Sequence, residues 1–368
     1  MERLPIGDEI QFVANCPLLP RYGFKKTDRR TEGEVPVRYR PLLERVLAGG
    51  SADTCPVAFW QHHPLADQQA STLVEATLRF QQTYDCDLVK ITPASTFQLI
   101  DYGFTDTWRG DYLGRRAVGP RMINSPDDWD RLPDLDPESG FVGQHVMCAR
   151  QVRHQLDDAV PVLQTVFNPV FQAAALGGDL FTTHLRDHPE AVQRGIDIIT
   201  AHTVTLIEAL VDARVDGIYL VAQHARAGAI CPADYGRVAL DADRACLQAA
   251  GALPLNFMHL HGEHVHAELA GSLPVRVLHY ATHADNSTAE SLLHRGRHGV
   301  STGPGQEGLI RSGSEQEAAD ETEEVLGRLK GPRFVLGAGC VLALDTPERN
   351  IHTAIAAART ARPDRADA

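Results

Sequence analysis

The chain has few of the features that mark secreted, membrane-spanning or disulfide-bonded proteins. Its seven cysteines are an odd number at wide spacings and include no C-x-x-C pair, so a disulfide framework is excluded and a reducing compartment is predicted. The N-terminal segment MERLPIGDE carries charge where a signal peptide needs an apolar core. The longest uncharged stretch, residues 159–178, is interrupted by polar residues and a proline and is not expected to cross a bilayer. We therefore expect a soluble, cytoplasmic protein.

The chain also has fewer basic than acidic residues. The 368 residues include 35 Lys and Arg against 48 Asp and Glu, which gives a formal net charge of −13. Binding of nucleic acid depends on Lys and Arg that neutralise phosphates, so this balance argues against nucleic acid and, less strongly, against an anionic membrane surface. We expect a small-molecule substrate, and a homodimer is compatible with the sequence.

Short apolar runs alternate with longer helical patterns from residue 55 onwards. Several runs are almost continuously apolar, as expected of parallel strands that are covered on both faces. Apolar residues at helical spacing fill the stretches between them. The predicted strands are 55–60, 87–92, 161–167, 216–223, 254–261, 275–282, 298–303 and 333–339, and the predicted helices are 67–84, 189–214, 232–250, 286–296, 314–330 and 347–360.

Eight β–α alternations predict an α/β protein with a (β/α)₈ TIM barrel, although an open doubly wound sheet is compatible with the same pattern. We assign the barrel to residues 41–360, an N-terminal extension to residues 1–40 and a flexible tail to residues 361–368. The connection between the second and third predicted strands is unusually long. It predicts an insertion at about residues 101–160, which would be a lid, a substrate loop or a second structural layer.

Histidine is concentrated in one part of the chain. Eight of the seventeen histidines fall between His259 and His298, and the pair His259-Leu-His261 closes a predicted strand. Residues i and i+2 of a strand share a face about 7 Å apart, so both imidazoles can converge on one ion. A histidine at a strand end can instead bond a backbone carbonyl, and the pair alone leaves both interpretations open.

The other strand ends supply further candidates, because barrel enzymes carry their chemistry there. Cys340 follows the last predicted strand, and thiolate and imidazole are favoured zinc ligands, although a buried cysteine is commonly only a small hydrophobe. The strand ends of a barrel surround one mouth, so the separation in sequence from His259 is no obstacle. The side chains that we expect to line the substrate pocket are Trp60, His62, His63, Gln223, His283 and Asn286.

Two residues are candidates for catalytic roles. Glu263 follows the histidine pair and would act as a general base, orient a ligand imidazole, or only help to start the next helix. His224 closes the fourth predicted strand and faces the same mouth.

Several segments, taken in order, resemble the uroporphyrinogen decarboxylase superfamily over roughly residues 40–360. This superfamily includes zinc-dependent methyltransferases that move a methyl group from a corrinoid to a thiol such as coenzyme M. The resemblance implies a (β/α)₈ barrel. The segments are RVLAGG (45–50), PVAFW (56–60), PVFQAAALGG (169–178), DGIYLVAQ (216–223), GAGC (337–340) and TPERNI (346–351).

The matching residues favour the methyltransferase branch. True decarboxylases bind a substrate with eight carboxylates through an arginine motif after the first strand, where this chain has WQHHP and no Lys or Arg between Arg45 and Arg79. The aspartate after strand two and the tyrosine after strand three are missing as well. The methyltransferase branch has His-x-Cys after strand five and a second Cys after strand eight. His259 and Cys340 match this pattern, and His261 replaces the middle cysteine.

The resemblance implies zinc held by His259, His261 and Cys340, with no tightly bound organic cofactor. Two neutral imidazoles and one thiolate leave the ion at +1, a stronger Lewis acid than the neutral site of the family. We expect methyl or other alkyl transfer to a thiol from a methylated corrinoid on a separate protein, because nothing in the chain resembles a corrinoid-binding domain. Two alternatives remain: a metal-assisted decarboxylase or lyase acting on a smaller acid, and a non-catalytic barrel that binds a small molecule.

Overall fold

The computed structural model describes residues 38–286 and 288–361. The predicted extension (1–40) and tail (361–368) therefore lie almost entirely outside the described residues. Within the described ranges, no helix combines the length and the apolar character that crossing a bilayer requires.

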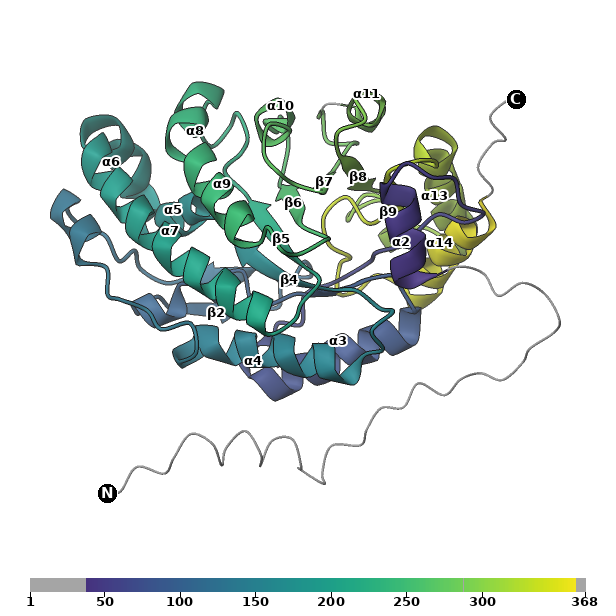
Figure 1. The fold of residues 1–368 in the computed structure, drawn as a ribbon, viewed down its shortest axis with the longest axis horizontal. Helices are drawn as coiled ribbons and strands as arrows, with labels where there is room; N and C mark the ends of the chain where they lie inside the picture. Colours follow the sequence, from purple (N-terminus) through teal and green to yellow (C-terminus); the bar gives the residue numbers. More distant parts are fainter. Residues whose placement is uncertain (1–37, 287, 362–368) are drawn as a thin grey trace, which may run out of the picture. The chain divides into compact units, whose positions relative to one another are not determined.

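Seven parallel strands form one curled sheet, with the order β1-β4-β5-β6-β7-β8-β9. Every residue in these strands is buried, which accounts for the apolar runs in the sequence. The sheet curves so that its helices lie on the outer side (Figure 1). The strands are β1 (Val89–Ile91), β4 (Val162–Phe167), β5 (Gly217–Ala222), β6 (Phe257–Leu260), β7 (Val277–Tyr280), β8 (Gly299–Thr302) and β9 (Phe334–Leu336).

The first predicted strand, 55–60, does not form a regular strand. Backbone hydrogen bonds join it to β9 and produce a single parallel bridge between Val57 and Leu336. On the side towards β1, the Asp87 N–H donates to the Val57 carbonyl at 2.8 Å, but the Val57 N–H donates to the carboxylate of Asp87 at 2.8 Å, so no regular ladder forms there. The structure thus confirms the α/β class and a curled parallel sheet, whereas the predicted (β/α)₈ barrel lacks its eighth regular strand within the described residues.

The six predicted helices lie close to their predicted limits, and the structure adds α2, α4, α5, α6, α10 and α12, which were not predicted. Local signals explain several of these limits: Asn168 accepts the Phe171 N–H before Pro169, and Ser314 forms a capping box with Glu317. The predicted helix 232–250 is divided in two at Ala239. The helices are α2 (Tyr39–Leu47), α3 (Ala70–Tyr84), α4 (Gly140–Gln155), α5 (Pro169–Gly177), α6 (Phe181–Asp187), α7 (Pro189–Asp212), α8 (Pro232–Val238), α9 (Leu240–Ala249), α10 (Ala267–Ala270), α11 (Ala289–His294), α12 (Leu309–Ser312), α13 (Glu315–Leu329) and α14 (Glu348–Thr360).

The predicted insertion at 101–160 contains an antiparallel hairpin, β2 (Asp106–Trp108) and β3 (Arg116–Val118), followed by α4. Helix α4 packs against α3 and belongs to the layer that covers the sheet. The hairpin loop reaches the other end of the sheet, where the Leu344 N–H donates to the carbonyl of Tyr112 at 2.7 Å. The insertion is therefore a strap between the first and last strands, with a helix that completes the outer layer.

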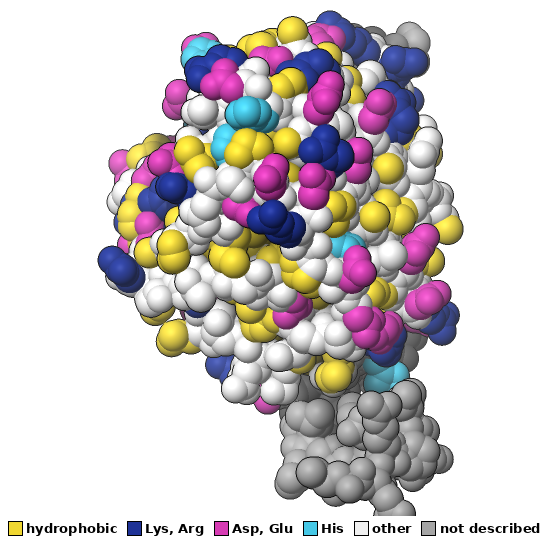
Figure 2. Space-filling view, turned by 90° about the vertical axis from the view of Figure 1, so that its left-hand side faces the viewer, with side chains coloured by type: hydrophobic (Ala, Val, Ile, Leu, Met, Phe, Trp, Pro, Cys, Tyr) yellow, Lys and Arg dark blue, Asp and Glu magenta, His cyan; other side chains and the backbone are white. Residues whose placement is uncertain are grey.

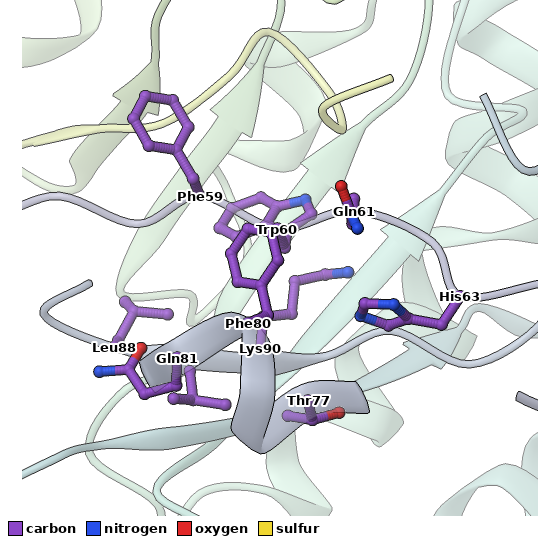
Figure 3. A pocket seen from close by; sticks show the side chains of 10 residues that line it. Phe59, Trp60, Gln61, His63, Thr77, Phe80, Gln81, Leu88 and Lys90 are labelled. Atoms are coloured by element: carbon purple, nitrogen blue, oxygen red, sulfur yellow. The ribbon is translucent and has the colours of Figure 1, made fainter. Parts of the chain in front are cut away.

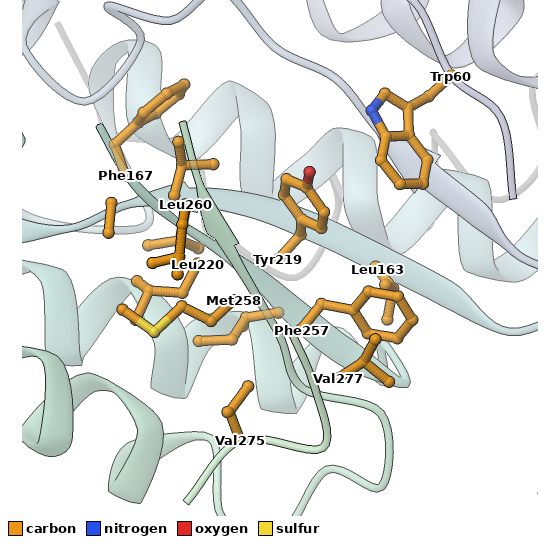
Figure 4. Packing of buried hydrophobic residues seen from close by; sticks show 14 of the residues in the cluster. Trp60, Leu163, Phe167, Tyr219, Leu220, Phe257, Met258, Leu260, Val275 and Val277 are labelled. Atoms are coloured by element: carbon orange, nitrogen blue, oxygen red, sulfur yellow. The ribbon is translucent and has the colours of Figure 1, made fainter. Parts of the chain in front are cut away.

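The core lies on both faces of the sheet, because side chains alternate along each strand. Figure 4 shows Tyr219 and Trp60 facing one another on the inner side, while Leu220 and Met258 point towards the helices. Burying a side chain of this size stabilises the fold by about 1.5–3 kcal/mol. This packing fixes the strand ends from which the candidate site is built.

One face of the molecule shows how the surface charge is distributed. Figure 2 shows Lys and Arg interspersed with Asp and Glu over that face, without a continuous basic patch. The prediction that the chain does not bind nucleic acid stays a prediction.

Candidate metal centre

The structure brings the three predicted metal ligands together. His259 lies on β6, His261 directly follows it, and Cys340 lies in the turn after β9. The Sγ atom of Cys340 is 3.5 Å from Nε2 of His259 and 3.4 Å from Nδ1 of His261. All three ligand atoms lie within 4.8 Å of one another.

These distances fit a tetrahedral zinc ion. Bonds of about 2.0–2.1 Å to nitrogen and about 2.3 Å to sulfur separate a nitrogen ligand from a sulfur ligand by roughly 3.5 Å. His259 is buried, whereas His261 and Cys340 are partly exposed. The ligand set can therefore hold an ion and leave one side open for a fourth ligand.

The protonation states of the ligands suit a cation. Burial lowers the pKa of His259 far below its ordinary value, and burial together with Arg226 lowers the pKa of His261. Both imidazoles are thus neutral at pH 7, with lone pairs to donate. Burial raises the pKa of Cys340 to about 11, against the opposing effect of Lys90. The Cys340 thiol therefore needs a cation to become a thiolate, and metal binding at neutral pH would release its proton.

Asn286 fixes the turn after His261. Its Nδ2 group donates to the carbonyls of Gly262 (2.9 Å) and Ala281 (2.7 Å), and its Oδ1 accepts the Val265 N–H at 2.9 Å. Gly262 has a φ of +92°, which favours glycine at this turn. The predicted pocket residue Asn286 thus lies between the loops that follow β6 and β7 and ties them together.

Trp60 fixes the turn that carries Cys340. The indole Nε1–H donates to the carbonyl of Cys340 at 2.9 Å, and the Leu342 N–H donates to the carbonyl of Trp60 at 2.9 Å. On the other side of the turn, a Cβ atom at Gly339 would lie 2.5 Å from the imidazole Cε1 of His283. The exposed His283 ring therefore packs directly against this turn, where only glycine leaves room for it.

His62 and His63 follow Trp60 and are held as neutral rings. Burial, with a further effect of Lys90, lowers the pKa of His62 to about 3 and that of His63 to about 4. The hairpin strap covers His62 so closely that a Cβ atom at Gly114 would lie 2.4 Å from the His62 Cβ. Nδ1 of His62 is buried and has no hydrogen-bond partner among the described residues.

His224 and Arg226 lie beside His261 and offer unused donors. Nδ1 of His224 and Nε of Arg226 are buried without a hydrogen-bond partner in the described part of the chain. Burial and the nearby Arg226 lower the pKa of His224 to about 4, so its ring is neutral at pH 7. A Cβ atom at Gly262 would lie 3.1 Å from Cδ of Arg226, which places the arginine stem against the turn after His261. This pair can therefore meet an acidic group of a ligand at the metal centre.

The remaining predicted residues are Glu263 and Gln223. Glu263 is exposed in the turn after His261, and the contacts of the described residues include none between its carboxylate and a metal ligand. Gln223 is partly exposed in the turn after β5. The catalytic role of Glu263 and the pocket role of Gln223 stay predictions.

Lys90 was missed by the sequence analysis. This residue of β1 is 7 % exposed, and its Nζ lies 5.1 Å from the ring centroid of Trp60 and 4.6 Å from that of Tyr219. It also lines a small pocket, in which the amine is directed towards His63 (Figure 3). Burial lowers the pKa of Lys90 to about 7, against the opposing effect of Cys340. A single lysine inside the apolar run DLVKIT was the signal that could have identified it.

The sequence places His279 near the end of a predicted strand but assigns it no role in the site. It lies on β7 directly opposite His259 of β6 and is fully buried. The sequence shows a histidine in each of two predicted strands, but it does not show that the two are paired in register.

The fold and the three ligands define a barrel-like α/β protein with a candidate metal site at its strand ends. The sequence profile of uroporphyrinogen decarboxylase (URO-D) matches residues 61–361, and the chain belongs to this family, which confirms the resemblance seen in the sequence. No curated protein matches the chain by sequence.

Two solved structures share the fold. A methyltransferase from Methanosarcina mazei superposes with a TM-score of 0.75 at 16% identity, over 86% of this chain and 97% of that one. A B12-independent methionine synthase from Shewanella sp. W3-18-1, in complex with selenomethionine, superposes with a TM-score of 0.53 at 16% identity, over 83% and 93%. At such identities the likeness concerns the fold alone.

Proposed function

We propose that this chain is a zinc-dependent transferase that activates a thiol substrate for methyl or other alkyl transfer. The observation that carries the proposal is the set of His259, His261 and Cys340, with sulfur-to-nitrogen distances of 3.5 and 3.4 Å and one open side. Zinc sites with three protein ligands keep the fourth position for water or substrate. Membership of the URO-D family and the methyltransferase among the fold relatives support group transfer. We also infer that the segment bridged to β9 at Val57 closes a (β/α)₈ barrel in place of a regular eighth strand.

The bound ion would act as a Lewis acid that lowers the pKa of a thiol in the fourth position. The chain would hold that ion through two neutral imidazoles and one thiolate, so the centre would carry a charge of +1. Trp60 would keep Cys340 in place, since its indole donates to the Cys340 carbonyl. The methyl donor would be a corrinoid on a separate protein, as in the methyltransferase branch of the family.

Two nitrogen atoms without hydrogen-bond partners beside His261 indicate what kind of thiol substrate the site would accept. Arginine binds carboxylate and similar anions through two parallel hydrogen bonds. Nε of Arg226 and Nδ1 of His224 are buried and lack hydrogen-bond partners within the described ranges. An acidic group on the thiol would fill this position while the sulfur lies at the metal.

Metal content and thiol binding test the proposal together. Protein purified without a histidine tag from zinc-supplemented cells should contain about one zinc per chain. Cobalt-substituted protein should gain a sulfur-to-metal charge-transfer band when a thiol is added. Cys340→Ser and His261→Ala should lose both signals, whereas Cys231→Ser, at an exposed cysteine outside the site, should keep both.

Other outcomes would contradict the proposal. Less than about 0.2 zinc per chain in the parent protein would contradict the proposed metal centre. Release of carbon dioxide from a small acid without a thiol would support the lyase alternative. Ligand binding that survives His261→Ala, without catalysis, would support a non-catalytic barrel.

A further inference from the structure

The fully buried side chain of His279 connects three segments of the barrel core beneath the proposed metal centre. Its Nε2 lies 2.8 Å from the carbonyl oxygen of Ala338, two residues before Cys340. Its Nδ1 lies 2.6 Å from the hydroxyl of Tyr219 on β5 and 2.8 Å from Nδ1 of His259 on β6. The backbone carbonyl of His279 lies 3.1 Å from the same nitrogen of His259.

These contacts determine where each imidazole proton resides. A carbonyl oxygen only accepts, so Nε2 of His279 must carry a proton and donate it to Ala338. In the neutral ring, Nδ1 of His279 is then an acceptor, towards which the Tyr219 hydroxyl and the Nδ1–H of His259 both point. Both neighbours of His259 Nδ1 are acceptors, so this nitrogen carries the proton. The lone pair at Nε2 of His259 is left free, on the side where Sγ of Cys340 lies 3.5 Å away.

We propose that His279 is a positioning residue for the metal centre, whose Nδ1 acceptor keeps His259 in the Nδ1–H tautomer and so presents its Nε2 to the ion. The inference rests on the proposed metal centre and adds a residue that acts on it through His259. Outer-shell partners of metal-bound histidines are commonly carboxylates, carbonyls or waters. A neutral imidazole adds no negative charge, so it orients the ligand without weakening the ion as a Lewis acid.

The same residue connects the two parts of the ligand set. One ring nitrogen bonds the segment that leads to Cys340, and the other faces the histidine on β6. The short contact with Tyr219 restrains the ring from a third direction. Both ligand-bearing segments are thereby held in one arrangement before an ion arrives.

Two amide substitutions separate the two nitrogens of His279. In His279→Asn the amide oxygen can take the place of Nδ1 and still accept from His259. In His279→Gln the amide nitrogen can take the place of Nε2 and still donate to Ala338, but the side-chain acceptor at 2.8 Å is lost, and only the backbone carbonyl of residue 279, at 3.1 Å, still faces His259 Nδ1. We expect zinc and cobalt affinity, measured by competition with a chelator, to stay within about 3-fold of the parent for His279→Asn and to fall by about 10- to 100-fold for His279→Gln.

If His279 only fills space in the core, a different order of metal affinity is expected for the two variants. Glutamine is closer to histidine in volume, so packing alone would favour His279→Gln, and equal affinities in the two variants or an advantage for glutamine would overturn the proposal. Tyr219→Phe removes the competing donor and should leave metal affinity within about 3-fold of the parent. A large loss in that variant would show that the ring is held by Tyr219 and not by its bond to His259.

Nitrogen NMR of ¹⁵N-histidine-labelled, metal-free protein gives a readout that needs no metal. His259 should be in the Nδ1–H tautomer in the parent and in His279→Asn, and the fraction of this tautomer should fall in His279→Gln, where only the backbone carbonyl of residue 279 still accepts. Parent protein with His259 in the Nε2–H tautomer would overturn the inference even if the variants do not fold. Parent protein that shows the expected tautomer but binds no zinc would contradict the proposed function and leave the assignment of His279 intact.

Discussion

His261 determines the charge of the proposed metal centre. In the methyltransferase branch that the sequence resembles, this position is a cysteine, and a site with one imidazole and two thiolates is neutral. With His261, a bound zinc ion would keep a charge of +1 and would withdraw more electron density from its fourth ligand. The position is thus the one at which this chain differs most in chemistry from the related pattern.

Replacing His261 by cysteine tests this difference. His261→Cys should still bind zinc and cobalt, but it should lower the pKa of a bound thiol by less than the parent does. We expect the pH midpoint of the sulfur-to-cobalt band to rise by about one unit. Cys231→Ser, at an exposed position, is the control for the change in cysteine number. An unchanged or lower midpoint would argue against a role for the ligand charge.

Lys90 should reduce stability at neutral pH. Its pKa is about 7 in the folded protein, because burial disfavours the ammonium, against an ordinary value of 10.5. Between these values the unfolded chain binds more protons, so the free energy of unfolding rises with pH through this window by up to about 1.4 kcal/mol per unit. Lys90→Met should therefore be more stable than the parent at pH 6.5 in urea unfolding, and the advantage should shrink towards pH 10. A difference that does not depend on pH would show that packing is responsible instead.

The sequence predicted site residues that belong to a local pattern, but not those whose role depends on how two strands are paired. His259 and His261 are two residues apart on one predicted strand, so their shared face could be predicted. Cys340 was found because strand ends surround one mouth. The contact of His279 with His259 depends on the register between β6 and β7, which no local pattern encodes.

The loops after β6 and β7 act as one element because Asn286 joins them. Asn286→Ala would remove three hydrogen bonds to Gly262, Ala281 and Val265. At about 0.5–1.5 kcal/mol each, we expect a loss of about 2–4 kcal/mol in the free energy of unfolding, together with faster dissociation of the metal from His261. Asn124 is exposed and distant in sequence from Asn286, so Asn124→Ala is the control in both measurements. Unchanged metal dissociation would show that the turn holds His261 without Asn286.

At the scale of helices and strands, the apolar spacing predicted most elements because their burial follows it. Strands buried on both faces and the long amphipathic α7 are examples. The hairpin of β2 and β3 was not predicted, because its three-residue strands are only partly buried and show no apolar alternation. The strand at 55–60 was predicted but is not regular, because the side chain of Asp87 takes a backbone N–H that a ladder needs.

For the whole molecule, the buried neutral histidines should make the free energy of unfolding depend strongly on pH below about 6.5. Folded pKa values of about 3 to 4 lie below the ordinary value of 6.5, so the unfolded chain binds more protons in this window. Stability from these groups is complete above pH 6.5 and is lost as the pH falls towards 4. With EDTA present, Tm followed by circular dichroism should drop clearly from pH 7 to pH 5, and equal values would contradict the burial of these rings. The histidines are His62, His63, His145, His224 and His279.

The bond between Trp60 and Cys340 joins residues that are 280 positions apart. A ribosome has therefore made nearly the whole barrel before the last ligand leaves its exit tunnel. Until then, His259 and His261 would offer a zinc ion only two of the three proposed ligands. Loading of the proposed metal centre would thus follow the synthesis of Cys340.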